Sequence, residues 1–372
     1  MRIAQVAPPI ESVPPRFYGG TERIVSYLTE ELVRQGHEVT LFASGDSVTQ
    51  AELVACTSRA LRMDPEVRDA LPYLVIAIDQ VRRRAHEFDV LHFHIDYLHF
   101  PLFRALSRNT VTTLHGRLDL PDLLPVFAAF PEMSLVSISD HQRRPMPHLR
   151  WLRTIHHGLP NDLYPFAPAP AGDYLAFLGR ICPEKRPDRA IEIARRAGIP
   201  LKIAAKVDRV DEAYFAEVVR PLLRDPSIEF VGEVGEAEKA SLLSGARGLL
   251  FPIDWPEPFG LVMIEAMACG TPVIAYRCGS VPEVIEDGIT GYIVDGIEAA
   301  VAAVDRLEAL DRGLIRRRFE DRFSAERMAR EYLAVYNGAQ DMIELPVQPP
   351  MSTTAPTAAA IPRLMPPDLI PS

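Results

Sequence analysis

Two glutamates in the stretch PEPFGLVMIEAMACGTPVIA (residues 256–275) are the first candidates for chemistry. Glu265 falls inside the run LVMIEAMA, whose other residues are apolar enough for a buried helix. A glutamate is rarely buried without a partner or a ligand. The carboxylate of Glu265 could accept hydrogen bonds from both hydroxyls of a ribose, as acidic residues do in dinucleotide sites. A salt bridge to an arginine is the structural alternative.

The second glutamate, Glu257, stands eight residues earlier between two prolines. The prolines hold this segment as a loop, so Glu257 cannot share a helix with Glu265. The helix is expected to begin near Phe259 or Gly260 instead. The amides of Phe259, Gly260 and Leu261 would then be donors at a helix N-terminus, which favours an anion.

Two cations, Arg180 and Lys185, follow a strand-like run in FLGRICPEK (residues 177–185) and precede a helix that opens at Pro187. In open α/β sheets, ligands bind at such strand-to-helix loops. A planar guanidinium and an ammonium from one loop can together neutralise a diphosphate. Two solvated surface cations are the alternative, but the position of the pair favours a functional interpretation.

A pair of glycines, Gly19 and Gly20, lies in FYGGTE between the first strand-like run and the first long helix. Glycines allow a backbone to approach a ligand closely, and the helix N-terminus that follows favours an anion. The segment could equally be an ordinary turn. It is not a dinucleotide fingerprint, because no G-x-G-x-x-G follows the strand.

The segment HFHIDYLH presents His92, His94, Asp96 and His99 with a spacing that metal-dependent hydrolases use for their ligands. On a strand, His92 and His94 would face the same side, as ligands of one metal must. Tyr97 stands where metallo-β-lactamase-type sites place a further histidine, and no second cluster supplies the remaining ligands. We therefore expect no metal site and favour a lining of the cleft on the acceptor side, with hydrolysis as an alternative.

The elements that position these residues alternate between short β-branched runs and amphipathic helices. A helix over residues 21–36 is expected to end at the capping glycine Gly36, and others are expected over 187–198 and 297–310. This alternation indicates parallel sheets covered by helices. The expected strands are residues 2–7, 38–43, 89–94, 110–115, 134–139, 153–158, 174–179, 201–206, 228–233, 248–253, 272–277 and 290–294.

A proline-rich stretch, residues 158–173, interrupts the alternation and is interpreted as a linker. The fold class predicted is therefore α/β, with two Rossmann-like, doubly wound domains that face each other across a cleft. The domains are expected at residues 1–160 and 173–323, with the linker at 161–172. Residues 343–372 are rich in Pro, Ala, Thr and Met without a period, and a disordered tail is expected there.

Composition agrees with a two-domain protein and excludes other classes. The 372 residues are 48% hydrophobic, which is enough for a large core. The net charge of −10 argues against nucleic acid as the main partner. Four cysteines without paired spacing suggest a reducing compartment. The start MRIAQVAPP lacks a signal-peptide core and no stretch approaches a membrane span, so a cytoplasmic location with at most peripheral membrane contact is expected.

Taken together, the motifs resemble the retaining nucleotide-sugar glycosyltransferases of family 4, which have the GT-B fold and an E-x7-E signature. The segments GRICPEKRPDRAIEIA, EFVGEV and EPFGLVMIEAMACGTPVIAYRCGSVPEVIEDGITGYIV occur in the order and spacing of that family. The resemblance runs from RIAQVAPP to FSAERMAREYLAVY, nearly the whole chain. It implies an acceptor-side domain at 1–160, a nucleotide-sugar-binding domain at 173–323, and a helix at 324–340 that returns to the first domain.

The resemblance also implies a role for each candidate residue. Arg180 and Lys185 would grip the donor diphosphate, and Glu265 would bind the ribose hydroxyls. Glu257 would contact sugar hydroxyls and phosphate, and His115, in TTLHG, would contact the transferred sugar. The catalytic set is then His115, Arg180, Lys185 and Glu257. The donor-binding set is Gly19, Gly20, Arg180, Lys185, Phe259, Gly260, Leu261 and Glu265.

The reaction that the resemblance implies is front-face transfer of a hexose with retention, in which the departing diphosphate helps to deprotonate the acceptor. Cations and a helix N-terminus can stabilise the leaving group without a metal, and the sequence has no D-x-D signature. No cofactor is expected beyond the nucleotide diphosphate sugar, with UDP-glucose as the first expectation. The acceptor would be a small molecule, a glycan or a lipid.

Two segments depart from the family pattern. AKVDRVD (residues 205–211) replaces glycines near the base pocket, which leaves the nucleotide open, and His157-Gly158 replaces the usual asparagine-glycine. A sugar-nucleotide epimerase shares the GT-B fold and is the alternative enzyme. A regulator that binds sugar nucleotides without catalysis has no positive support in the sequence.

Overall fold

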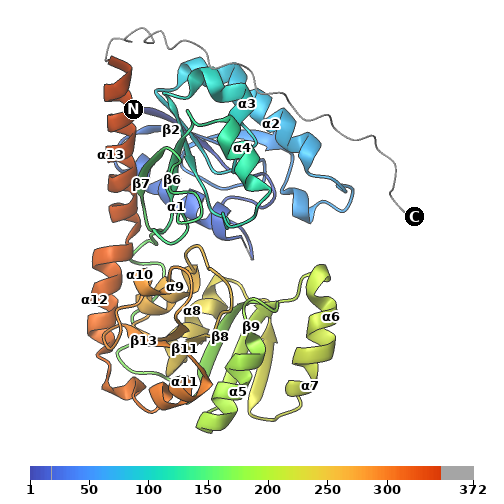
Figure 1. Cartoon of the computed structure of the whole chain (residues 1–372), viewed down its shortest axis with the longest axis vertical. Coiled ribbons are helices and arrows are strands. Elements are labelled where there is room, and N and C mark those ends of the chain that lie inside the picture. Colours follow the sequence, from blue (N-terminus) through green and yellow to red (C-terminus); the bar gives the residue numbers. More distant parts are fainter. Residues whose placement is uncertain (18, 345–372) are drawn as a thin grey trace, which may run out of the picture.

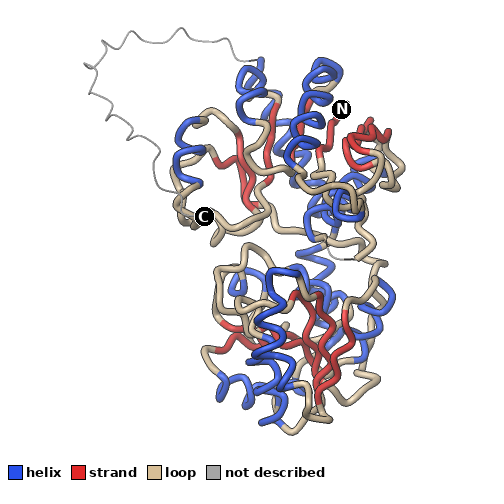
Figure 2. Tube along the Cα trace, turned by 90° about the vertical axis from the view of Figure 1, so that its right-hand side faces the viewer, coloured by secondary structure: helices blue, strands red, loops and turns tan. Residues whose placement is uncertain are grey.

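The computed structural model describes residues 1–17 and 19–344, which form two α/β lobes stacked along the long axis of the molecule (Figure 1). In both lobes the strands lie between helices, as the view turned by 90° also shows (Figure 2). All strand pairings that define the two sheets are parallel. The predicted α/β fold class with two Rossmann-like domains is confirmed.

The amino-terminal sheet has the strand order β3-β2-β1-β4-β5-β6-β7. Its strands are β1 (Arg2–Val6), β2 (Glu38–Ser44), β3 (Glu52–Thr57), β4 (Val90–Phe93), β5 (Thr110–Thr113), β6 (Ser134–Ser137) and β7 (Trp151–Thr154). Its helices are α1 (Gly20–Arg34), α2 (Leu71–Arg84), α3 (Phe100–Phe103) and α4 (Leu123–Ala129).

The carboxy-terminal sheet has the order β10-β9-β8-β11-β12-β13. Its strands are β8 (Leu175–Arg180), β9 (Leu201–Lys206), β10 (Ile228–Gly232), β11 (Gly248–Phe251), β12 (Val273–Tyr276) and β13 (Gly291–Val294). Its helices are α5 (Pro187–Ala197), α6 (Glu212–Tyr214), α7 (Arg220–Leu222), α8 (Glu236–Gly245), α9 (Leu261–Ala268), α10 (Val281–Val284), α11 (Ile297–Val304) and α12 (Arg312–Phe323). A π-helical turn, Phe215–Val219, joins α6 to α7.

The central strands are buried on both faces because helices cover both sides of each sheet. Every residue of β4, β5, β6 and β11 is buried. Short runs with β-branched or apolar residues, such as VLHF, TVTT and GLLF, predicted these strands. The predicted end of the first helix also holds, because Gly36 follows α1 with φ +84, a left-handed conformation that glycine adopts without strain.

The chain passes between the domains twice, and the two passages lie side by side. Leu159 and Ser324 form an isolated parallel bridge. The carbonyl of Leu159 accepts a hydrogen bond from the amide of Ala325, and the amide of Leu159 donates to the carbonyl of Phe323. Gly158 is required here, since a Cβ at this position would lie 2.3 Å from the carbonyl oxygen of Ser324. The two passages therefore form one hydrogen-bonded hinge.

Helix α13 (Ala325–Glu344) leaves this hinge and packs against α1 of the amino-terminal domain. Figure 1 shows α12 beside the lower lobe and α13 running on along the upper lobe. The side chains of Tyr332 and Tyr336 are fully buried there. The last described helix thus belongs to the packing of the first domain.

Some predicted elements differ from the structure. Strand β3 was not predicted, because this edge strand is only half-buried and its sequence ELVACT lacks a continuous apolar pattern. The strand expected at residues 153–158 is β7, which ends at Thr154. The helix expected over 297–310 ends at Val304 and is followed by a 3₁₀ turn, Leu307–Ala309.

The segment at 161–172 lies against the carboxy-terminal domain rather than spanning between the two. The amide of Ala167 donates to the backbone carbonyl of Cys269. The carbonyl of Ala167 in turn accepts from the Arg312 side chain over 2.8 Å. The amide of Gly172 donates to Gly245. The expected tail at 343–372 begins two residues too early, since α13 continues to Glu344. Residues 345–372 lie outside the described part of the chain.

Candidate functional site

A cleft of about 620 Å³ lies between the domains, at the carboxyl ends of the strands of both sheets. The amino-terminal domain contributes residues that follow β1, β5 and β6, and the carboxy-terminal domain contributes residues at the ends of β8, β9 and β11. This is the edge at which open α/β sheets bind ligands. Every predicted site residue lines this one cleft: Gly19, Gly20, His115, Arg180, Lys185, Glu257, Phe259, Gly260, Leu261 and Glu265.

The glycine pair brings the amino-terminal backbone close to the carboxy-terminal domain. A Cβ on Gly20 would lie 3.5 Å from the Leu261 side chain of α9. On Gly19, a Cβ would lie 2.8 Å from Pro15, so only glycine fits the loop. Helix α1 therefore begins directly opposite the start of α9, and the two helix N-termini border the same cleft.

Helix α9 begins where the sequence predicted, with Gly260 at its N-cap. Gly260 has φ +79, and a Cβ there would lie 2.8 Å from Met263, so both conformation and packing require glycine. The hydroxyl of Ser280 donates to the carbonyl of Phe259 over 2.7 Å and holds the loop. The amide of Met263 donates to the carbonyl of Gly260 over 3.0 Å. The amides that precede it come before the first helical acceptor and are suited to an anion.

Glu257 and Lys185 form an ion pair on the floor of this loop. The indole of Trp255 donates to Glu257 over 2.9 Å, and the Lys185 ammonium lies 5.0 Å from the Trp255 ring centroid. The backbone of Glu257 packs closely against Gly279, because a Cβ on Gly279 would overlap it. A cation and a carboxylate are thus fixed together beside the N-terminus of α9.

Glu265 has the partner that its burial requires, and the partner is a lysine. The Lys239 ammonium, from α8, lies 2.7 Å from Oε1 of Glu265, whose side chain is 6% exposed. The hydroxyl of Tyr164 donates to Glu265 over 3.3 Å. Lys239 also lies 3.2 Å from Glu236, which pairs with Arg23 of the amino-terminal domain. The arginine partner considered as an alternative is therefore not found on Glu265 in the described structure.

Arg180, at the end of β8, is held by several carboxylates. It lies 3.4 Å from Glu184 and 3.4 Å from Asp211, and 3.8 Å from Asp208. Both aspartates belong to the segment AKVDRVD that departs from the family pattern, and Lys206 of that segment pairs with Asp208 over 2.5 Å. The segment AKVDRVD thus places charged side chains where the family pattern has glycines.

His115 follows β5 and faces the cleft from the amino-terminal domain. Its Nε2 lies 2.9 Å from Nδ1 of His94, and its ring stacks on His157 with centroids 5.3 Å apart. Burial lowers the pKa of His115 to about 3. The imidazole is therefore neutral near pH 7 and can act as a hydrogen-bond partner but not as a charge.

The histidine cluster of HFHIDYLH does not line the cleft, and this corrects the expected acceptor-side role. His92, His94 and His99 are buried, and each is hydrogen-bonded to protein: His92 to Thr113, His94 to His115, and His99 to Thr112. His92 and His94 do face the same side, with rings 4.0 Å apart. No group of three or more His, Cys, Asp or Glu suited to a metal occurs among residues 1–17 and 19–344. The described structure therefore offers no set of metal ligands for the metal-dependent hydrolase that is the alternative.

Among the cleft residues that the sequence did not predict, three polar ones lie beside predicted residues. Lys239 is an isolated lysine on a helix, and no pattern marked it as the partner of Glu265. His157 was noticed only as a departure, although it lines the cleft and stacks on His115. Glu22, directly after the glycine pair, lines the cleft with its pKa raised to about 7 by burial. For Glu22 the available signal was its place next to a predicted ligand loop, and for His157 it was the departure from the family pattern.

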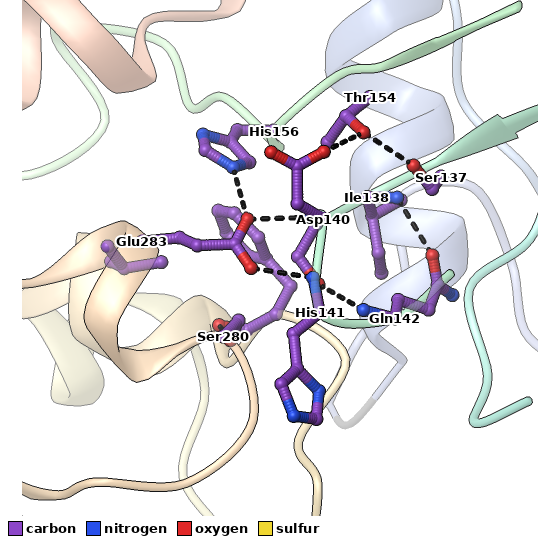
Figure 3. A network of polar contacts seen from close by, with 12 residues as sticks. Ser137, Ile138, Asp140, His141, Gln142, Thr154, His156, Ser280 and Glu283 are labelled. Carbon is purple, nitrogen blue, oxygen red and sulfur yellow. Dashed lines mark hydrogen bonds and ion pairs between the residues drawn. The ribbon is translucent and has the colours of Figure 1, made fainter. Parts of the chain in front are cut away.

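The domains also meet behind the cleft, where Glu283 of α10 reaches the amino-terminal domain (Figure 3). Its carboxylate accepts from the amides of Asp140 and His141, each over 2.7 Å, and from His156 over 3.2 Å. The backbone carbonyl of Glu283 accepts a hydrogen bond from Arg322 of α12. One carboxylate thereby links the turn after β6, the hinge and the carboxy-terminal domain.

No helix in the described part of the chain is long and apolar enough to cross a membrane.

Two family models match consecutive parts of the chain. Residues 18–174 match Glycosyltransferase Family 4, and residues 167–323 match Glycosyl transferases group 1. Together the two matches span residues 18–323.

Two curated relatives are mycobacterial enzymes. A phosphatidyl-myo-inositol mannosyltransferase of Mycolicibacterium smegmatis is 27% identical over 361 residues, covering 86% of this chain and 89% of the relative. A D-inositol 3-phosphate glycosyltransferase of Mycobacterium bovis is 34% identical over 145 residues, covering 37% of this chain and 30% of the relative.

Solved structures share the fold over most of this chain. A glycosyltransferase involved in avilamycin A biosynthesis superposes with a TM-score of 0.70 at 23% identity, covering 91% of this chain and 98% of the other. A sucrose-phosphate synthase from Thermosynechococcus elongatus gives 0.72 at 20% identity, covering 92% and 99%. The Anabaena protein HepE in complex with UDP and glucose gives 0.69 at 17% identity, covering 91% and 100%.

Proposed function

We propose the following reaction for this chain, which belongs to the family 4 glycosyltransferases and has their GT-B fold. A hexose moves from a nucleoside diphosphate sugar to an acceptor hydroxyl with retention of the anomeric configuration. The observation that carries this proposal is the shared cleft, in which Lys185, Glu257 and Glu265 of one domain face Gly20 and His115 of the other.

The diphosphate would bind at the cations and the N-terminus of α9. Lys185 is held by Glu257 and Trp255, and Arg180 is held by Glu184 and the aspartates after β9, so both positive charges are in place before the donor arrives. Charge that grows on a departing diphosphate is stabilised most by groups that need no reorganisation. These groups supply the positive charge for a reaction without a metal.

Bond changes would take place on one face of the sugar. The acceptor oxygen forms its bond to the anomeric carbon on the side from which the diphosphate leaves, and the C–O bond to the phosphate breaks. The acceptor proton passes to an oxygen of the departing diphosphate. A covalent glycosyl-enzyme would need a carboxylate nucleophile beside the anomeric carbon, and Glu257 is already engaged by Lys185.

The nucleoside would lie over the carboxy-terminal sheet, with its ribose at Glu265. The carboxylate of Glu265 has Oε1 on Lys239 and can accept ribose hydroxyls as well, since a carboxylate has several acceptor sites. UDP-glucose is the proposed donor. The presence of UDP and glucose in the HepE structure is in keeping with it, although that likeness carries the fold alone.

The acceptor is proposed to be a polyhydroxylated compound, in free, glycan or lipid-linked form. Inositol groups occur in the names of both mycobacterial relatives, so myo-inositol and its phosphate and phosphatidyl derivatives are the first acceptors to test.

The test is a donor panel followed by product analysis. UDP-, GDP- and ADP-sugars are screened for thermal stabilisation, since a ligand that binds only the native state raises stability by mass action. The stabilising donor is then incubated with each acceptor, with and without EDTA, and the product anomer is read by NMR. Stabilisation by UDP-glucose and EDTA-resistant transfer with retention are expected. Inversion, or loss of activity in EDTA, would refute the mechanism, and interconversion of the donor sugar without an acceptor would identify an epimerase instead.

A further inference from the structure

The cleft histidine His115 is joined to the carboxy-terminal helix α13 by a chain of buried hydrogen bonds. His115 Nε2 lies 2.9 Å from His94 Nδ1, and His94 Nε2 lies 2.9 Å from the amide oxygen of Gln5. The amide nitrogen of Gln5 donates to the hydroxyl of Tyr336 over 3.1 Å. Gln5 and Tyr336 are both fully buried, so water does not interrupt the chain.

Gln5 gives this chain a direction, because its amide oxygen can only accept and its amide nitrogen can only donate. The oxygen faces His94, so the proton lies on Nε2 of His94. Burial, together with nearby histidines, lowers the pKa of His94 well below its usual value, so the ring is neutral and its Nδ1 can only accept. The hydrogen between the two rings therefore belongs to Nε2 of His115, and the Nδ1 of His115 is left as a lone pair.

The same amide also sets the direction of the other arm of the chain. Tyr336 accepts from Gln5, so its own hydroxyl hydrogen goes to Nδ1 of His92 over 2.7 Å. His92 is then protonated on Nε2, which donates to the hydroxyl of Thr113 over 2.7 Å. Thr113 in turn meets the hydroxyl of Tyr332 at 2.9 Å. Each of these groups has a hydrogen-bond partner while it is neutral. Rotating the Gln5 amide so that its oxygen and nitrogen exchange places would reverse the direction of each hydrogen bond.

We propose that Gln5, acting through His94, is a positioning residue that holds His115, whose side chain lines the cleft, as the Nε2–H tautomer and so keeps its Nδ1 unprotonated. The ligand group that fits Nδ1 is a hydroxyl that donates a hydrogen bond. A phosphate or carbonyl oxygen, which can only accept, does not fit. Given the proposed function, this hydroxyl belongs to the transferred hexose. His157, stacked on His115, holds the plane of the ring.

The first experiment reads the tautomer directly in the full-length protein without ligand. The ring nitrogens are observed by NMR after ¹⁵N-histidine labelling, and the signals of His115 are identified by their loss in His115→Ala. A protonated Nε2 and an unprotonated Nδ1 are expected, unchanged between about pH 5 and about pH 8. A protonated Nδ1, or a doubly protonated ring in this range, would overturn the proposal.

The second experiment tests the control exerted by Gln5. Gln5→Met replaces the amide with an apolar chain of similar length. Tyr332→Phe is the matched control, because this hydroxyl is hydrogen-bonded to Thr113 at the far end of the chain of hydrogen bonds. For Gln5→Met we expect mixed His115 tautomers and a kcat at least about fivefold lower, in line with the loss of one hydrogen bond. Tyr332→Phe should keep the single tautomer.

A single Nε2–H tautomer in Gln5→Met, or equal mixing in Tyr332→Phe, would refute the role of Gln5. If Gln5→Met does not fold, the wild-type spectrum still decides the tautomer. The spectrum needs no substrate, so a correct tautomer in a protein that transfers no sugar would refute the proposed function and leave the positioning role intact.

Discussion

The ammonium of Lys239 lies 2.7 Å from Oε1 of Glu265, so the glutamate of the apolar helix α9 is one half of a buried ion pair. Both residues line the cleft between the domains. Removing one member of a buried pair leaves the other charge uncompensated, whereas a ligand that adds hydroxyl donors can use the carboxylate already in place. The pair thus gives Glu265 both a structural partner and an orientation toward a ligand.

Replacing Glu265 with glutamine should weaken donor binding more than it weakens the fold. Hydrogen bonds to charged groups contribute about 1.5–3 kcal/mol each, so the affinity for the nucleotide sugar should fall at least about tenfold. Lys239 keeps Glu236 at 3.2 Å, so its charge remains compensated. Calorimetric titration and apo melting are measured side by side. Normal affinity combined with a lower melting temperature would show that Glu265 is structural only.

Replacing Lys185 with alanine should remove affinity for the diphosphate but not for the nucleoside. The ammonium pairs with Glu257 in the cleft. Its loss removes a charged hydrogen bond to phosphate, so a nucleoside diphosphate should bind about tenfold more weakly or worse. Lys202→Ala is the matched control, because Lys202 pairs with Glu229 outside the cleft lining. An equal loss of affinity for the bare nucleoside would contradict the diphosphate assignment.

Replacing Glu283 with glutamine should change how stability depends on pH. Burial raises the pKa of Glu283, but hydrogen bonds from His156 and from the amides of Asp140 and His141 outweigh it and hold the pKa below the ordinary 4.5. A lowered native pKa means that the carboxylate contributes stability above about pH 4.5, and that this contribution disappears as the pH falls through the native pKa.

Chemical denaturation of the wild type and Glu283→Gln across this range measures the effect. At neutral pH the variant should be less stable by about 1–3 kcal/mol, and the two curves should converge in acid. Glu298→Gln serves as control, since this glutamate is exposed on α11 and pairs only with Arg196 in the described structure. A constant difference at all pH values would show that the charge of Glu283 contributes nothing.

Truncation should separate helix α13 from the residues that follow it. Ending the chain after Phe323 removes Tyr332 and Tyr336, which are fully buried against the amino-terminal domain. Loss of one large buried side chain costs about 3–5 kcal/mol, so this truncation should lower the melting temperature sharply or abolish folding. Ending the chain after Glu344 keeps α13 and should leave melting and transfer unchanged. Destabilisation by the second truncation would assign a structural role to residues 345–372.

Much of the architecture could be read from local patterns. The run LKIAAK forms β9 and GLLF forms β11, because the positions that each strand buries are apolar. Gly260 ends a loop and starts α9 because its left-handed backbone suits glycine. Such features depend on neighbours in the sequence, so the position of Glu265 on a helix facing the ligand edge was predictable. Edge strand β3, half-buried and without a continuous apolar run, was not.

The sequence by itself determined the two-domain α/β fold, the order of its loops and a set of candidate residues that all line one cleft. The partners of those residues came only from the tertiary structure. Lys239 meets Glu265, and Glu283 meets His141, because separate helices pack together, and no spacing along the chain encodes such a pair. The same holds for His94, whose type suggests a ligand. Burial against Gln5 makes it neutral and turns it toward His115, since hydrogen-bond direction and desolvation depend on what surrounds a ring rather than on what precedes it.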